Sequence, residues 1–245
     1  MFRLKKNFKR ELEEIKSTLR REIRFKAGEF DELIDLEFSE LDNNACALIV
    51  LSINQAFGGN ARPAIGLATI IQYIFMADQV HHMMKDDSYL EESKRQFPVL
   101  VGDYLYGKFF LGLCKEKLLR FLAPMAQVIG EMNEGSISRW LSQREKISEA
   151  EQIHILEMER ASLTGLAARL GADLAGCSDK VQQQCEALGW QLGFAWAASQ
   201  DHMEKSVIEK ALSQARDILK DWSGSKEHSL YELVDYMEGN LGGAL

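Results

Sequence analysis

Apolar side chains recur every three or four residues along most of this 245-residue chain, and that spacing is typical of one face of an α-helix. Proline would interrupt such runs because it removes a backbone donor from a helix interior, but the chain contains only three prolines. No segment alternates between apolar and polar residues strictly enough to be a strand. The sequence therefore predicts an all-α fold. The first segment shows the pattern at Leu4, Phe8, Leu12, Ile15, Leu19 and Ile23.

Polar and glycine-containing stretches divide the chain into successive helices. Asp42, Asn43 and Asn44 carry side-chain oxygens suited to a helix start. The polar residues 88–97 are expected to be a connection, with Pro98 opening the next helix. Glycine weakens helices, so Gly171, Gly176 and Gly224 are expected to be breaks. The expected helices cover residues 1–26, 45–56, 63–86, 98–113, 118–134, 148–176 and 180–222.

The first 26 residues differ in charge from the rest of the chain. They hold ten Lys or Arg against four Glu, or +6, so a net charge of −8 leaves about −14 for the remainder. An acidic body disfavours a nucleic-acid partner. We expect residues 1–26 to form a basic amphipathic helix docked on a single domain, 27–245, because no linker divides the chain. The alternative is that this helix contacts an anionic membrane surface or an acidic partner.

The cysteines and the N-terminus indicate a compartment. Cys46, Cys114, Cys177 and Cys185 form no CxxC pair and no zinc-like spacing. They are typical of reduced core residues. The first residues lack the apolar segment of a secretory signal, and no uncharged apolar run is long enough to cross a bilayer. We expect a cytoplasmic protein.

Two polar clusters contain residue types that bind metals. His82 and Asp86 are four residues apart, so on a helix they share a face and are able to hold a divalent cation between them. Asp201 and Glu204 are three residues apart. The alternative for both clusters is a solvated helix end. No GxSxG, P-loop or GxGxxG motif occurs, so spacing alone predicts no further chemistry.

The order of several short motifs resembles the polyprenyl diphosphate synthases, trans-isoprenyl transferases of the all-α isoprenoid synthase fold. Residues 80–88 read Val-His-His-Met-Met-Lys-Asp-Asp-Ser, and residues 99–105 read Val-Leu-Val-Gly-Asp-Tyr-Leu. Residues 129–135 resemble the family's Glu-Met-x-x-Gly-Glu helix end. Residues 160–163 and 192–196 resemble its Lys-Thr-Ala-Ser-Leu and Leu-Gly-x-Ala-Phe segments. The resemblance implies a helical bundle, with the 99–105 motif as its most specific match.

The first Asp-rich motif of that family is degenerate here. His82 and Met83 stand at its two leading Asp positions, Asp86 is kept, and Asp87 follows. The family uses these carboxylates to hold magnesium and an allylic diphosphate. A thioether is no substitute for such an oxygen ligand.

The second Asp-rich motif and the diphosphate-binding positions are altered as well. Gln200, Asp201 and Glu204 stand where the family has Asp-Asp-x-x-Asp. The stretch that corresponds to the isopentenyl diphosphate site, about residues 41–47, has no basic residue, and Glu159 replaces a lysine. Exchanging positive for negative charge repels a diphosphate. The resemblance therefore implies a fold kept without catalytic residues and without a cofactor of its own.

The hypothesis that follows is a non-catalytic, regulatory subunit of a heteromeric polyprenyl diphosphate synthase. A catalytic partner subunit would supply both Asp-rich motifs and Mg²⁺, and the chain alone would form a homodimer. This chain would contribute a wall of the product channel. Two alternatives stay open: a metal-dependent helical-bundle enzyme that uses His81 with His82, Asp86, Asp201 and Glu204, or an isoprenoid-binding protein without turnover. The expected wall residues are Phe75, Met76, Met83 and Met84.

Overall fold

Every regular element in the described part of the chain is a helix. The computed structural model describes residues 3–23, 38–82, 92–142, 147–220, 222 and 225–241, and these ranges contain no strand. Their buried apolar side chains form one core cluster. The all-α prediction is therefore confirmed.

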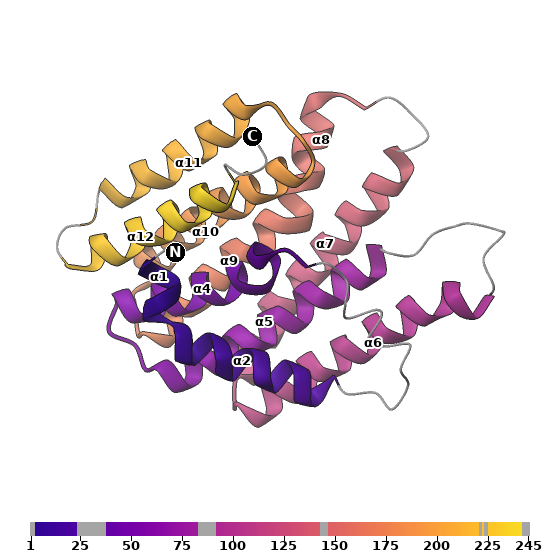
Figure 1. Cartoon of the computed structure of the whole chain (residues 1–245), viewed down its shortest axis with the longest axis horizontal. Coiled ribbons are helices and arrows are strands. Elements are labelled where there is room, and N and C mark those ends of the chain that lie inside the picture. The colour runs from indigo at the N-terminus through magenta and orange to yellow at the C-terminus, as the bar shows by residue number, and fades with distance from the viewer. Residues whose placement is uncertain are drawn as a thin grey trace.

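Two central helices, α4 (Glu40–Ala56) and α5 (Ala61–His82), are buried along most of their length. They pack against each other, α9 (Ser162–Leu174) packs on α4, and α6 (Glu92–Lys115) pairs with α5 (Figure 1). By length and composition α5 would suit a membrane span, but 83% of its most apolar window is buried inside the bundle. Its apolar character is thus accounted for by its position in the core.

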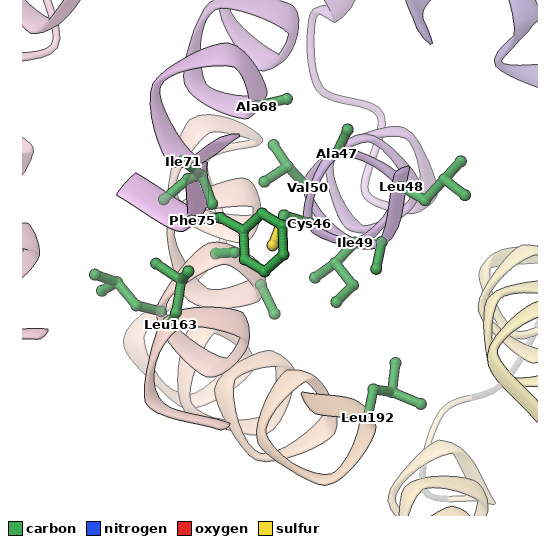
Figure 2. Close-up of a cluster of buried hydrophobic side chains, with 14 of the residues drawn as sticks. Cys46, Ala47, Leu48, Ile49, Val50, Ala68, Ile71, Phe75, Leu163 and Leu192 are labelled. Carbon is green, nitrogen blue, oxygen red and sulfur yellow. The ribbon is translucent and has the colours of Figure 1, made fainter. Parts of the chain in front are cut away.

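The side chain of Phe75 lies at the centre of this core. It points from α5 toward α4, among Cys46, Val50 and Leu163 (Figure 2). Its ring centroid is 5.3 Å from that of Trp196, and neither side chain is exposed. Burying aromatic side chains of this size removes a large apolar area from water, which stabilises the fold.

The remaining helices surround the central pair. At the N-terminus, α1 (Arg3–Asn7) packs on α12 (Ser225–Leu241), and α2 (Lys9–Glu22) packs on α5. The single helix predicted for residues 1–26 is thus divided at Phe8, and residues 24–37 lie outside the described chain. The other peripheral elements are η1 (Leu119–Phe121), α7 (Leu122–Ser142), α8 (Glu149–Leu156), the π-helical turn η2 (Glu157–Ala161), α10 (Asp179–Gln200) and α11 (Lys205–Lys220).

The contact between α9 and α10 depends on glycine. A Cβ atom at Gly189 would lie 2.4 Å from the carbonyl oxygen of Thr164, and one at Gly193 would overlap the Thr164 side chain. These distances are far below van der Waals contact, so the two backbones pack this closely only because both residues lack a side chain. The Leu-Gly-Phe-Ala-Trp motif at residues 192–196 therefore has a packing role.

The start of α6 corrects one prediction. Residues 92–97 belong to this helix, so a connection over the whole of 88–97 is wrong, and Pro98 lies inside the helix rather than at its start. Glu, Lys, Arg and Gln are good helix formers, so a polar stretch rich in them extends a helix where apolar periodicity gives no signal. Residues 83–91 lie outside the described chain.

Other boundaries differ for local reasons. Ser39 caps α4 through a capping box with Asp42, so the helix begins before the predicted Asp42 signal. Gly171 is not a break, because it lies inside α9 where its missing side chain lets the carbonyl oxygen of Val50 approach. Gly176 has a positive φ of 77° and follows the end of α9, as expected. The single helix predicted for residues 180–222 is divided, because α10 ends at Gln200 and His202 adopts a positive φ of 54°.

Candidate functional site

Four helical segments bring His82 and Asp201, which the sequence resemblance assigns to the two altered motifs, into one network of charged side chains. His82 ends α5, Arg139 lies near the end of α7, Glu159 lies in the π-turn η2, and Asp201 follows α10. Arg139 and Asp201 are 62 residues apart in the chain. We call these residues, with Asp78, the charge network.

His82 lies between two carboxylates. Its Nδ1 atom is 3.4 Å from Oδ2 of Asp78, and its Nε2 atom is 3.5 Å from Oε1 of Glu159. The Nε2 atom is also 2.9 Å from Oγ of Ser136 on α7. Burial by itself would lower the pKa of His82, but Asp78 and Glu159 raise it to about 9. The imidazole is therefore a cation at neutral pH.

Arg139 connects the π-turn to the second motif. Its Nε donates to both carboxylate oxygens of Glu159 at 2.9 Å, and its Nη1 donates to Oδ1 of Asp201 at 2.7 Å. The other oxygen of Asp201 accepts from Nε2 of Gln152 at 2.6 Å. This planar guanidinium satisfies two carboxylates at once, a geometry that a lysine cannot reproduce.

Both carboxyl groups that contact Arg139 are held in the ionised form. Burial would raise the pKa of Glu159, but hydrogen bonds from His82 and Arg139 lower it. Burial would likewise raise the pKa of Asp201, but hydrogen bonds from Gln152 and Arg139 lower it. Opposite charges therefore alternate from Asp78 through His82, Glu159 and Arg139 to Asp201. Two cations of this chain thus offset two of the three carboxylate charges in the network.

The π-turn η2 orients its two charged residues differently. Glu159 faces the charge network, whereas the guanidinium of Arg160 lies 4.4 Å from the ring centroid of Phe75 and 4.3 Å from that of Trp196. Arg160 is 6% exposed, and its Nε and Nη1 atoms have no hydrogen-bond partner among the described residues. Burial lowers the pKa of Arg160 while Asp78 opposes that shift. The ring faces stabilise the cation in place of water.

The structure brings His82 and Asp201 into the charge network, although Glu159 and Arg139 lie between them. Gln200 instead donates to Oδ1 of Asp42 at 2.9 Å and so ties α10 to α4. Glu204 is exposed, and Ser206 donates a hydrogen bond to it. His81 lies beside Tyr106, with its Nε2 3.8 Å from Oδ1 of Asp103.

The predicted channel residues are only partly described. Phe75 is in the sealed core beneath Arg160, and Met76 is partly buried against that core. Met83, Met84, Asp86 and Asp87 lie outside the described residues.

Sequence reasoning missed Arg139 and Asp78. It considered Glu159 only through the family resemblance, and it gave no indication that both Glu159 and Arg160 are buried. The spacing of four between Asp78 and His82 was an available signal, since such residues are neighbours on a helix. Arg139 had no local signal, because both of its partners come from other helices.

The described residues of the charge network do not suit the magnesium ions that the resembled family uses in its catalytic members. Mg²⁺ requires free oxygen ligands in near-octahedral geometry. In this network the oxygens of Glu159 and Asp201 accept hydrogen bonds from a guanidinium, and a cationic imidazole lies beside Glu159. Across the described ranges, no group of three or more His, Cys, Asp or Glu is able to hold a metal ion. The two local cations offset most of the negative charge that would attract a divalent ion.

Comparison with known proteins supports the family resemblance seen in the sequence. Residues 46–221 match the family described as polyprenyl synthetase. Geranylgeranyl diphosphate synthase of Methanosarcina mazei is 25% identical over 190 residues, which cover 69% of this chain and 56% of that relative. The chain thus spans about half the length of that protein.

Two solved structures with the same fold come from heteromeric or small-subunit proteins. One is described as a mint deletion mutant of heterotetrameric geranyl pyrophosphate synthase, with a TM-score of 0.78, 18% identity, and coverage of 93% of this chain and 98% of that one. The other is the geranyl diphosphate synthase small subunit from Antirrhinum majus, with a TM-score of 0.76, 15% identity, and coverage of 96% and 100%. At these identities the likeness shows the fold.

Proposed function

This chain belongs to the polyprenyl synthetase family, and from that premise we propose that it is a non-catalytic, regulatory subunit of a heteromeric trans-polyprenyl diphosphate synthase. Its partner would be a catalytic subunit that condenses isopentenyl diphosphate with an allylic diphosphate. That subunit would provide both Asp-rich motifs and the Mg²⁺ they hold. This chain would supply an interface and adjust activity or product length.

The single observation that carries the proposal is the position of Arg139. Its guanidinium contacts Glu159 and also Asp201, and Asp201 stands in the second motif, where family chemistry needs carboxylates free to hold metal ions. Glu159 also adds a negative charge at a position where the family resemblance implies a diphosphate-binding lysine. A diphosphate would meet repulsion from these carboxylates and would have to displace an intramolecular ion pair.

A second observation indicates where a partner would bind. The exposed large apolar side chains of the described residues all lie on α6, η1 and α7. A concentration of this kind is typical of a surface covered by another protein. On the isolated chain the same surface would support a homodimer. Its residues are Val99, Leu100, Phe110, Leu111, Leu119, Ile137, Trp140 and Leu141.

Two of the structural relatives support the proposal of a subunit role. The solved structures with this fold include a chain described as a small subunit and one described as part of a heterotetramer. The small-subunit chain is covered over its full length. A protein of this size and fold is therefore compatible with a subunit role.

The first test is an assay of the purified chain alone with isopentenyl diphosphate, an allylic diphosphate and excess Mg²⁺. We expect no chain extension, measured by incorporation of radiolabel into the extended product. A full-length synthase with both Asp-rich motifs, assayed in parallel, shows that the conditions permit turnover. Extension by this chain above the level without enzyme would overturn the proposal.

The second test is co-expression with a full-length synthase from the same organism. We expect the two chains to co-purify and the product length or rate to differ from that of the synthase alone. Leu111→Glu on the exposed apolar surface should abolish co-purification, because it places a charge in a buried interface. Ser213→Glu adds the same charge at an exposed position of α11 and should leave the complex intact. Equal co-purification of both variants would place the interface elsewhere.

A further inference from the structure

Helix α2 presents three chemically distinct sides. Its apolar side is docked on the body, with Leu12 and Ile15 buried. Around the helix, at 100° per residue, three acidic residues share one flank, whereas basic residues occupy the other flank and the outer side. The acidic flank comprises Glu11, Glu14 and Glu22.

The acidic flank is engaged by the body of the protein. Glu14 accepts a hydrogen bond from Arg62 of α5 at 2.6 Å. Glu22 accepts from Lys115 of α6 and from the hydroxyl of Tyr73, both at 3.2 Å. Burial would raise the pKa of Glu22, but Lys115 and Lys108 lower it. These contacts fix the rotation of α2 about its own axis, so that its basic residues face outward.

The basic side of α2 has no such partners within the described ranges. Five exposed cations occupy it, and none of their side chains makes an ion pair or hydrogen bond with a described residue of the chain. The one exposed acid among them is Glu13. From the first to the last the cations extend about 18 Å along the helix. They are Lys9, Arg10, Lys16, Arg20 and Arg21, and we call them the basic face.

We propose that the basic face docks the protein on the anionic headgroups of a phospholipid membrane. The contact is one of charge complementarity: an extended row of cations that pair with no described residue faces outward from a molecule with a net charge of −8. At physiological salt, charges more than about 8 Å apart are largely screened. The basic face is therefore attracted to a negative surface. The acidic remainder of the protein lies further from that surface, so the repulsion between the two is small.

The composition of the basic face favours a lipid surface over a protein or a nucleic acid. Protein interfaces are anchored by buried aromatic or aliphatic side chains, and single-stranded nucleic acids are held by aromatic stacking beside the cations. The exposed residues of α2 are charged or hydroxyl-bearing, with no aromatic among them. Because the apolar side is used for packing on α5, the docking is peripheral, without insertion of an apolar face.

The test is co-sedimentation of the full chain with phosphatidylcholine vesicles and with vesicles that also contain phosphatidylglycerol. We expect binding to the anionic vesicles alone at about 0.1 M salt, and release at about 1 M salt, where the screening length falls to about 3 Å. The variant Lys9→Gln, Lys16→Gln, Arg20→Gln should bind on the order of 100-fold more weakly. The charge-conserving variant Lys9→Arg, Lys16→Arg should bind as the wild type does, because both positive charges are kept.

A matched control removes three exposed cations elsewhere. Lys180→Gln, Lys205→Gln, Lys210→Gln on α10 and α11 changes the net charge by the same amount and should bind as the wild type does. Equal weakening of both triple variants, equal binding to uncharged vesicles, or no binding to anionic vesicles would each overturn the proposal. Binding to a mixed-sequence RNA that depends on the basic face, without vesicle binding, would assign this surface to a nucleic acid instead. None of these outcomes depends on whether the chain is catalytic.

Discussion

The contact between α9 and α10 and the charge network beside it are held by different physical forces. Along the contact, Gly189 and Gly193 lie so close to Thr164 that no side chain fits. In the charge network, Arg139 joins Glu159 and Asp201 through hydrogen bonds and charge. Close packing of two backbones requires glycine at particular positions. Charge balance requires only that residues of opposite charge lie next to each other. A family fold can therefore keep its helix packing while the chemistry of its site is replaced.

The largest effect should come from filling the helix contact. Gly189→Val should destabilise the protein by about 3 kcal/mol or more, because the carbonyl group of Thr164 is backbone and cannot rotate away. Urea unfolding followed by circular dichroism measures this. Gly130→Ala is the control, since a Cβ there meets nothing within 4 Å and alanine favours the helix by about 0.5–1 kcal/mol. Equal stabilities for the two variants would mean that the helices are not in close contact.

Breaking the charge network should have the next largest effect. Arg139→Gln leaves Asp201 without its cation and Glu159 with His82 alone, and should cost about 2 kcal/mol, less than a fully buried pair because Arg139 is 32% exposed. Arg139→Lys should recover part of this loss, since it restores the charge without the planar geometry. Unfolding free energies of the three proteins test the ordering. A Gln variant as stable as the wild type would show that the network carries no stability.

The charge network also predicts how stability depends on pH. The pKa of His82 is about 9 in the folded chain against an ordinary value of 6.5, so its stabilisation is complete below pH 6.5 and is lost as the pH rises through 9. The melting temperature of the wild type should fall over that window, and His82→Gln should lack this part of the fall. The measurement is the melting temperature of both proteins at several pH values from 6 to 10. An equal fall for the wild type and for His82→Gln would contradict the role of His82.

The smallest effect is expected for a surface ion pair that joins α9 to α10. Arg169 of α9 lies 3.1 Å from Glu186 of α10, and both side chains are more than a third exposed. Arg169→Gln should change the unfolding free energy by about 0.5 kcal/mol or less, because water screens the pair. A loss comparable to that of Arg139→Gln would show that exposure does not separate these two ion pairs.

Much of the fold was accessible from local sequence. Apolar spacing located α2, α4 and α5, since a helix is specified by residues three and four apart. It placed the start of α6 too late, because helical residues there are polar. The family-like motifs at residues 99–105 and 192–196 predicted the architecture, and His82 and Gln200 at the expected Asp positions led to the prediction of altered chemistry. Whether a catalytic partner binds stays a prediction.

The sequence by itself determined that the chain is all-α and resembles a known family, because periodicity and motif identity are properties of neighbouring residues. Only the tertiary structure decided how the remaining charges are used. Arg139, Glu159 and Asp201 come from three separate segments, and Arg160 is buried between the rings of Phe75 and Trp196. Electrostatic and ring contacts act through space, so their partners are known only once the helices are packed.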